Sequence, residues 1–278
     1  MTHYFQLSGG GNDFLALVEP ESTPSPAQVI AWCRRGLSVG ADGLFVLKRS
    51  PLGAHMTYFN ADGSEANLCL NGTRCAVQLA CYLGWAEDEI DIVTGVGALS
   101  GRKTDESRAA LIVEIPAGGK MTDLVVDSGS IRVWQIRVGV PHVLVLWHEC
   151  LETAPVTELG ARLRSHPDLG NDGANASFVR FPKRNRIEIR TFERGVEAET
   201  LACGTGVLAA VSWGLELDQL DLPVCATTLG GFDLTVEPLE GPDGDSGRWI
   251  FGGDARIISE GDLLEGALEL PSPVRWSP

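Results

Sequence analysis

The chain has little positive charge and no long apolar run. Of its 278 residues, 22 are Lys or Arg and 37 are Asp or Glu, which gives a formal charge of −15 at pH 7. Because a phosphate-binding surface needs a basic face, we expect no nucleic-acid partner. No stretch approaches the roughly 20 apolar residues that cross a bilayer, and residues 1–5 lack a basic segment leading into an apolar run. We therefore expect a cytoplasmic protein with no membrane partner.

The cysteine content does not indicate a disulfide framework. Seven cysteines form an odd number in a long chain without a secretion signal, which fits a reducing compartment. Hydrophobic residues make up 44% of the chain, enough for a large core. The length is compatible with one large domain or with two smaller ones.

The second half of the chain repeats short segments of the first half in the same order, at an offset of about 130 residues. The matching segments are 9–17 with 139–146, 40–46 with 172–179, 56–60 with 187–193, and 65–72 with 199–206. Cys69 and Cys203 lie 134 residues apart, as do Glu65 and Glu199. A repeat of this length predicts two similar domains related by pseudo-twofold symmetry.

The predicted fold is α/β (α+β), with two pseudo-symmetric domains that are each a β-sheet or barrel curled around a central helix. This follows from the strand-rich pattern of each repeat and from the one clear helix after each repeated cysteine. The sequence Pro-Ala-Gly-Gly at 116–119 marks the expected boundary. The N-terminal half would cover residues 1–118 and the C-terminal half 119–262. We expect residues 263–278 to cross back and complete the N-terminal half.

Each repeated cysteine stands at the expected start of a helix. Cys69 precedes residues 75–83 and Cys203 precedes residues 207–213, and both segments have helical apolar spacing. A helix start offers unpaired N–H groups and the positive end of a dipole, which lower the pKa of a thiol and can hold a carboxylate. If the two domains face each other, one thiolate can remove a Cα proton while the other thiol delivers a proton to the opposite face. The pattern therefore favours an amino-acid epimerase.

The remaining residues of interest have simpler interpretations when each is taken alone. A buried apolar role is the default for a reduced cysteine, and we expect it for Cys33, Cys75, Cys81, Cys150 and Cys225. The spacing of the cysteines near residue 69 differs from that of a zinc site, so we expect no metal. The glycines at 9–11 precede a strand, which argues against a dinucleotide-binding loop. By themselves, His142 could be a strand histidine and Glu193 with Arg194 a surface ion pair.

Taken together, several segments closely resemble the diaminopimelate epimerases over nearly the whole chain. These segments are GGGNDF (9–14), GADGL (40–44), FNADGSE (59–65), CLNGTRC (69–75), GVPH (139–142), Asn175, and ERG through ETLACGTG (193–206). The resemblance implies an isomerase that interconverts LL- and meso-diaminopimelate without pyridoxal phosphate, metal or any other cofactor, in the pathway to lysine and peptidoglycan. It also implies a homodimer that binds this small amino-acid substrate.

The resemblance further assigns roles to individual residues. The acid/base pair would be Cys69 and Cys203, while His142 and Glu193 would lie beside the reacting amino group and tune the thiols. Backbone N–H groups for the reacting carboxylate would come from Leu70, Asn71, Gly204 and Thr205. The rest of the substrate would be bound by Asn12, Asn60, Asn175 and Arg194, with Arg194 as a fork for the distal carboxylate.

The chain departs from the family pattern at two substrate-binding positions. Many members have asparagine where this chain has Val140 and glutamine where it has Gly43, so the contacts to the distal end of the substrate would differ. Leu70, where glycine is usual, matters less if only its backbone is used. Two rival interpretations stay open. One is a racemase of another amino acid on the same scaffold, and the other is a binding or redox-sensing protein in which Cys69 and Cys203 form a disulfide.

Overall fold

The computed structural model describes residues 2–126, 129–241 and 244–268. The N-terminal half contains β1 (Thr2–Gly9), β2 (Asn12–Val18), α1 (Pro26–Cys33), β3 (Gly43–Ser50), β4 (Gly53–Asn60), β5 (Glu65–Ala66), α2 (Leu70–Tyr82), β6 (Glu89–Thr94), β7 (Gly97–Asp105) and β8 (Arg108–Glu114). The C-terminal half contains β9 (Lys120–Val126), β10 (Gly129–Val138), β11 (Val140–Leu146), α3 (Val156–Arg164), β12 (Asn175–Lys183), β13 (Arg186–Glu193), β14 (Ala198–Thr200), α4 (Gly204–Glu216), β15 (Val224–Thr228), β16 (Asp233–Gly241) and β17 (Gly244–Asp254). The strand β18 (Arg256–Leu263) follows, and short 3-10 helices cover Leu151–Thr153, Pro167–Leu169 and Glu265–Leu268.

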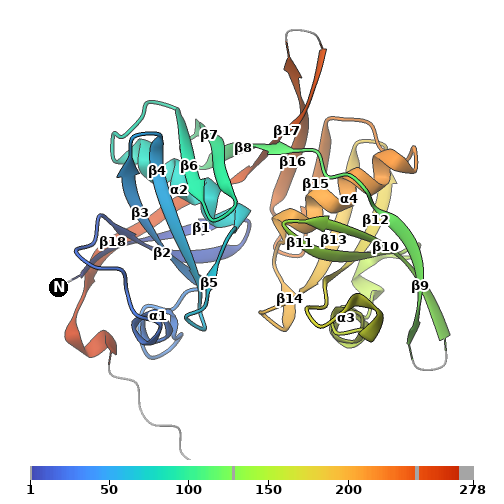
Figure 1. Cartoon of the computed structure of the whole chain (residues 1–278), viewed down its shortest axis with the longest axis horizontal. Coiled ribbons are helices and arrows are strands. Elements are labelled where there is room, and N and C mark those ends of the chain that lie inside the picture. The colour runs from blue at the N-terminus through green and yellow to red at the C-terminus, as the bar shows by residue number, and fades with distance from the viewer. Residues whose placement is uncertain (1, 127–128, 242–243, 269–278) are drawn as a thin grey trace, which may run out of the picture.

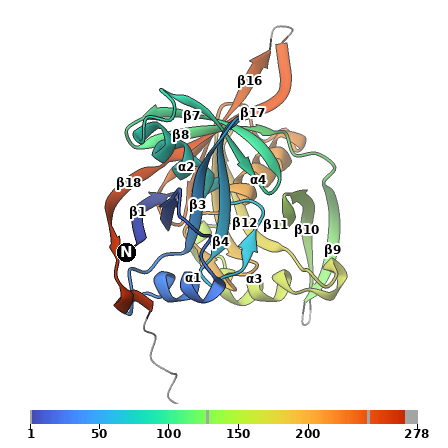
Figure 2. The ribbon, with the colours of Figure 1, turned by 60° about the vertical axis from the view of Figure 1, so that its left-hand side comes forward.

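The two halves have the same strand order. It is β18-β1-β2-β3-β4-β6-β7-β8 in the first half and β9-β10-β11-β12-β13-β15-β16-β17 in the second. The parallel neighbours also correspond, since β2 pairs with β3 and β4 with β6 in one half, and β11 with β12 and β13 with β15 in the other. Each sheet curls around one helix, α2 or α4 (Figure 1), as the view turned by 60° also shows (Figure 2). The predicted pseudo-symmetric architecture is confirmed.

The halves are joined edge to edge by β8 and β17. These strands pair antiparallel, with Leu111 opposite Phe251. Residues 115–119, where the sequence predicts the boundary, connect β8 to β9. The chain then returns to the first half as β18, which pairs with β1 from Thr2 opposite Leu263 to Ser8 opposite Arg256. The return to the N-terminal half therefore begins at Arg256, earlier than the expected residue 263. The reason is that the whole of β18 pairs with β1, just as β9 pairs with β10 in the other half. Residues 269–278 lie outside the described part of the chain.

Central strands are buried on both faces, which explains their continuous apolar sequences. On β2, Phe14 and Ala16 face the core that surrounds α2, whereas Leu15 and Leu17 face a second core on the other side of the sheet. This alternation follows from the period of two along a strand. Full burial of Phe14, Leu15 or Leu17 contributes roughly 1.5–3 kcal/mol each relative to an exposed side chain.

An outer helix that the sequence analysis does not anticipate closes the second core of each half. In the first half this is α1, which buries Val29 and Trp32. Ser25, the residue before the helix, forms a capping box with Gln28. In the second half α3 has the same place and buries Val156. The inner helices α2 and α4 lie on the opposite face of each sheet and contribute buried residues to one shared core cluster.

Candidate active site

Cys69 and Cys203 occupy the same structural position in the two halves. Each is the residue immediately before a buried helix, with φ −138° and ψ 104° at Cys69 and φ −120° and ψ 105° at Cys203. The Gly72 N–H, in the first turn of α2, donates to the Cys69 sulfur at 3.4 Å. Both cysteines therefore lie at helix starts, as the sequence predicts.

The two helix starts lie against each other. The side-chain amide of Asn71 donates across the junction to the carbonyl of Ala202, at 3.4 Å. A Cβ added at Gly204 would stand 3.2 Å from the Cβ of Leu70. Only glycine fits this approach without displacement, so the first turns of α2 and α4 are in direct contact.

Glu193 links the two thiols electrostatically. Its charge raises the pKa of both Cys69 and Cys203, which places one carboxylate near both sulfurs. Thr200 donates a hydrogen bond to this carboxylate. Burial raises the pKa of Glu193 above its ordinary value, while the hydrogen bonds from Thr200 and Cys203 oppose that shift.

The surroundings of Cys203 are more enclosed than those of Cys69. Cys203 is 6% exposed and Cys69 is partly exposed, and all seven cysteines are free thiols. The side-chain amide of Asn175 donates to the Cys203 sulfur at 3.8 Å, and the hydroxyl of Thr205 lies 3.5 Å from it. Asn175 thus contacts the thiol itself, beyond the substrate contact that the resemblance implies.

Burial determines the pKa of both thiols. It raises the pKa of Cys69 from an ordinary 9.0 to about 11, although the Gly72 N–H and the Arg74 charge act in the lowering direction. Burial and then Glu193 raise the pKa of Cys203 well above 9.0. The expectation that the helix start lowers the thiol pKa is therefore wrong for the net value, because the cost of burying a thiolate exceeds the stabilisation by N–H groups.

His142 is a neutral imidazole in a closed environment. It is 1% exposed, and neither ring nitrogen has a hydrogen-bond partner in residues 2–126, 129–241 and 244–268. Burial, with a contribution from the Arg194 charge, lowers its pKa from 6.5 to about 3. Arg194 donates its backbone N–H to Asn175 at 2.8 Å, and its guanidinium has no ion-pair partner within the same described ranges.

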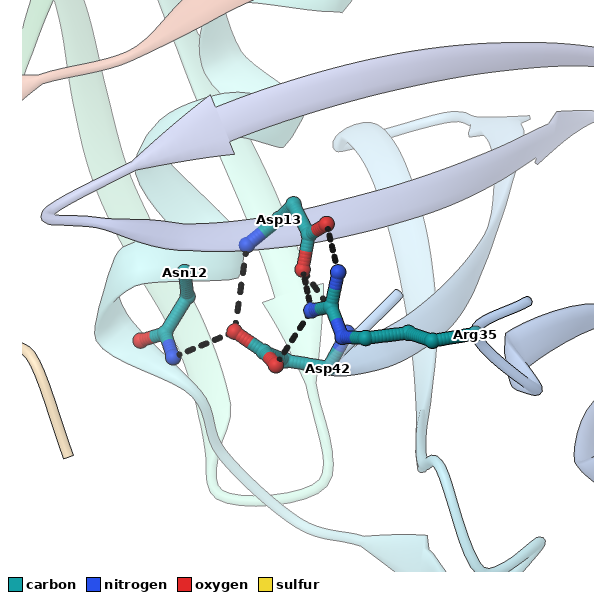
Figure 3. A network of polar contacts seen from close by, with 4 residues as sticks. All are labelled: Asn12, Asp13, Arg35 and Asp42. Atoms are coloured by element: carbon teal, nitrogen blue, oxygen red, sulfur yellow. Dashed lines mark hydrogen bonds and ion pairs between the residues drawn. The ribbon is translucent and has the colours of Figure 1, made fainter. Parts of the chain in front are cut away.

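Asn12 is held by a polar network at the start of β2 (Figure 3). Its amide nitrogen donates to Asp42 at 3.0 Å, and its amide oxygen accepts from Asn71 at 2.9 Å. Arg35 in turn bridges Asp42 and Asp13, at 2.7 and 2.5 Å. This network fixes the orientation of the Asn12 amide beside the start of α2.

The comparisons with known proteins identify the family of this chain. The family model described as diaminopimelate epimerase matches residues 4–119 and 135–240. The chain belongs to the diaminopimelate epimerase family.

Curated members of the family cover most of the chain. The diaminopimelate epimerase of Methanothrix thermoacetophila is 36% identical over 248 residues, which cover 82% of this chain and 86% of that protein. The diaminopimelate epimerase of Gemmatimonas aurantiaca is 31% identical over 275 residues, with 94% and 98% covered. The chain is therefore an isomerase by family.

Solved structures with the same fold are more distant in sequence. A putative phenazine biosynthesis protein from Clostridium difficile has a TM-score of 0.70 at 14% identity, with 95% of this chain and 100% of that chain covered. A hydroxyproline epimerase from Agrobacterium vitis has a TM-score of 0.68 at 15% identity, with 96% and 94% covered. These likenesses confirm the fold class alone.

The remaining site residues that the resemblance implies lie in the first turns of α2 and α4 and at the end of β4. Leu70, Asn71, Gly204 and Thr205 form the first turns of α2 and α4. Asn60, at the end of β4, uses its amide nitrogen to donate to Ser64 at 3.0 Å. Val140 begins β11, two residues before His142 on the same strand.

Two buried side chains near Cys69 are not anticipated by the sequence analysis. Arg74 is 0% exposed and donates to the Asn71 side chain at 2.7 Å, so it holds the amide that reaches the opposite half. Tyr58 is 9% exposed, and burial, followed by the nearby Cys69, raises the pKa of its phenol well above 10.0. Tyr58 could have been found by periodicity, because it lies two residues before Asn60 on one strand and so shares its face.

Two further properties of the described residues concern metal-binding clusters and membrane-spanning helices. In the ranges that the structure describes, no group of three or more His, Cys, Asp or Glu side chains could hold a metal ion. No described helix combines the length and apolar character required to span a membrane.

Proposed function

We propose that this chain interconverts LL- and meso-diaminopimelate by proton transfer at Cα between Cys69 and Cys203, without a cofactor. Membership of the diaminopimelate epimerase family supports the substrate. The observation that carries the mechanism is the paired placement of the two thiols before α2 and α4, whose first turns are in contact. The homodimer and the cytoplasmic location stay predictions.

The proposed reaction has two proton transfers. The thiolate of one cysteine takes the Cα proton, and the C–H electron pair stays on the substrate as a carbanion conjugated with the carboxylate. The thiol of the other cysteine then protonates this carbanion from the opposite face and becomes the thiolate. The N–H groups of Leu70 and Asn71, together with those of Gly204 and Thr205, would bind the carboxylate and stabilise its growing charge.

Charged and polar side chains near the two thiols would bind the ammonium group and the distal carboxylate of the substrate. Glu193, close to both thiols, would accept hydrogen bonds from the ammonium group of the substrate. His142 would offer a neutral imidazole beside the same group, since its pKa is lowered to about 3. Arg194 would pair with the distal carboxylate, with Asn12, Asn60 and Asn175 completing the polar surface.

The alternatives are less well supported. A racemase of another amino acid would need a different distal pocket, and Val140 and Gly43 are the positions at which this chain departs from the family pattern. A redox sensor would close a disulfide between Cys69 and Cys203, and membership of an epimerase family gives that role no support. Neither alternative accounts for the agreement with epimerases along most of the chain.

The test is an isotope-exchange experiment. The reduced protein is incubated with LL-diaminopimelate in D2O, and deuterium entry at Cα is followed together with formation of the meso isomer. We expect exchange and inversion in the wild type, loss of inversion in Cys69→Ala and in Cys203→Ala, and normal turnover in Cys225→Ala, a partly buried control on β15. If reduced wild-type protein inverts other amino acids but not diaminopimelate, the substrate assignment is wrong.

A further inference from the structure

Gly43 and Asn175 are equivalent positions of the two halves. Gly43 lies opposite Phe14 in the pairing of β2 with β3, and Asn175 lies opposite His142 in the pairing of β11 with β12. On the C-terminal side, Asn175 places an amide donor on the Cys203 sulfur. On the N-terminal side, Gly43 has no side chain to do the same for Cys69.

The hydroxyl of Tyr58 occupies the space that a side chain at Gly43 would need. A Cβ built at Gly43 would lie 2.5 Å from the Tyr58 hydroxyl oxygen, 2.8 Å from its ring carbon Cε2 and 2.8 Å from the backbone carbonyl oxygen of Phe59. No side chain can enter this space while the phenol is there. The Tyr58 phenol and the Phe59 carbonyl together exclude a side chain at position 43.

Packing directs this phenol toward the start of α2. Met56, Tyr58 and Asn60 share one face of β4, and the Met56 methyl carbon stands 3.2 Å from the Cβ position of Gly72 in the first turn of α2. The Tyr58 ring packs edge-to-face on Phe14, with 6.1 Å between ring centroids. The Cys69 sulfur lies 3.5 Å from the same Cβ position of Gly72, so the ring stands on the side of α2 that carries this thiol. The phenol and the thiol also shift each other's pKa, after the larger effect of burial on both.

The Tyr58 hydroxyl is a donor at any working pH. Burial, followed by Cys69 and Glu193, raises the pKa of the phenol well above 10.0, so it stays protonated. The other titratable groups that act on Cys69 are Arg74, which lowers its pKa, and Glu193, which raises it. The neighbouring Cys75 has its own pKa raised by burial and remains a thiol.

We propose that Tyr58 is a positioning residue of the acid/base pair, whose hydroxyl donates to the Cys69 sulfur and stabilises its thiolate as Asn175 does for Cys203. The inference rests on the proposed function, which makes Cys69 a base in one direction and an acid in the other. A hydrogen bond to a charged acceptor is worth enough to change the thiolate fraction about tenfold.

The test is the pH dependence of Cys69 alkylation in Tyr58→Phe. Iodoacetamide labelling is quantified by mass spectrometry on the tryptic peptide 50–74, whose one cysteine is Cys69. We expect labelling at pH 8 to be about tenfold slower than in the wild type, with the profile displaced to higher pH. Removal of the hydroxyl opens the site, so an effect of access alone would speed labelling; an unchanged or faster rate overturns the proposal.

Matched controls come from the other two tyrosines of the chain, Tyr4 and Tyr82. Tyr82→Phe, at the exposed end of α2, and Tyr4→Phe should both leave the rate of Cys69 labelling unchanged.

Epimerase kinetics separate this inference from the proposed function. In Tyr58→Phe, kcat/KM should fall by the same factor in the LL-to-meso and meso-to-LL directions, because the equilibrium constant is unchanged. If the wild type fails to invert diaminopimelate while Tyr58→Phe still slows labelling, the proposed function fails and the role of Tyr58 stands. If the wild type inverts the substrate and labelling is unaltered in Tyr58→Phe, the role of Tyr58 fails.

Discussion

The side-chain amide of Asn175 joins two parts of the site, since its nitrogen donates to the Cys203 sulfur at 3.8 Å while its oxygen accepts the Arg194 N–H at 2.8 Å. Asn175→Asp keeps the acceptor for Arg194 but places a negative charge beside Cys203. Because a like charge disfavours the thiolate, we expect kcat/KM to fall roughly tenfold or more. Asn175→Ala loses both contacts at a 4% exposed position and should also lower unfolding free energy by about 1–3 kcal/mol.

Steady-state kinetics and urea unfolding of the two variants distinguish these effects. Both variants should lose activity and stability, but the stability loss of the aspartate variant should shrink at low pH, where the buried carboxyl is protonated, whereas that of the alanine variant should not. An aspartate variant with wild-type kcat/KM would mean that the amide does not act on Cys203.

The raised thiol pKa values predict the pH dependence of the reaction. Below the pKa of the cysteine that acts as base, the thiolate fraction increases tenfold per pH unit. With Cys69 at about 11 and Cys203 well above 9.0, log kcat/KM should rise with unit slope on its acidic side, and the limb should continue to pH 9. Initial rates in both directions between pH 6 and 9.5 check this, and a plateau reached below pH 7.5 would contradict it.

His142 predicts a loss of folding stability in acid. Its pKa is about 3 in the folded chain and 6.5 when unperturbed, so the unfolded chain binds more protons between these values. The stability that depends on neutral His142 is therefore complete above pH 6.5 and falls by roughly 1.4 kcal/mol per unit below it. Between pH 6.5 and 5, the wild type should lose about 2 kcal/mol more than His142→Gln in urea unfolding. Parallel stability curves for the two proteins would show that His142 is not the group responsible.

Part of the site is visible in the sequence because it depends on position along the chain. The offset of 134 residues between Cys69 and Cys203 indicates the repeat, and the apolar spacing after each cysteine places both at helix starts. The duplicated strand order follows from the same repeat. Ser25 and Gln28 also form a local capping-box pattern at the start of α1.

The rest depends on packing between segments that are distant in sequence. The contact of Asn175 with Cys203 and the approach of Tyr58 to Gly43 require the strand register and the seating of α2 and α4, which no local pattern gives. The thiol pKa values show the same limit. A helix start can be recognised from sequence, but the burial that outweighs its effect on Cys69 is a property of the assembled halves.

Arg194 provides a test of substrate specificity in which charge is kept and shape is changed. Its guanidinium has no ion-pair partner within residues 2–126, 129–241 and 244–268, and it lies near His142. A guanidinium can bind a carboxylate through two parallel hydrogen bonds, whereas an ammonium is a single point charge. In Arg194→Lys, kcat/KM for diaminopimelate should therefore fall at least tenfold, mainly through a higher KM, because the thiols are untouched.

Arg132→Lys, in a surface pair with Asp123 at 3.0 Å, is the matched control and should keep wild-type kinetics. Near-normal turnover in Arg194→Lys would remove Arg194 from the distal-carboxylate role, and a fall in kcat with unchanged KM would place it at the reacting centre instead.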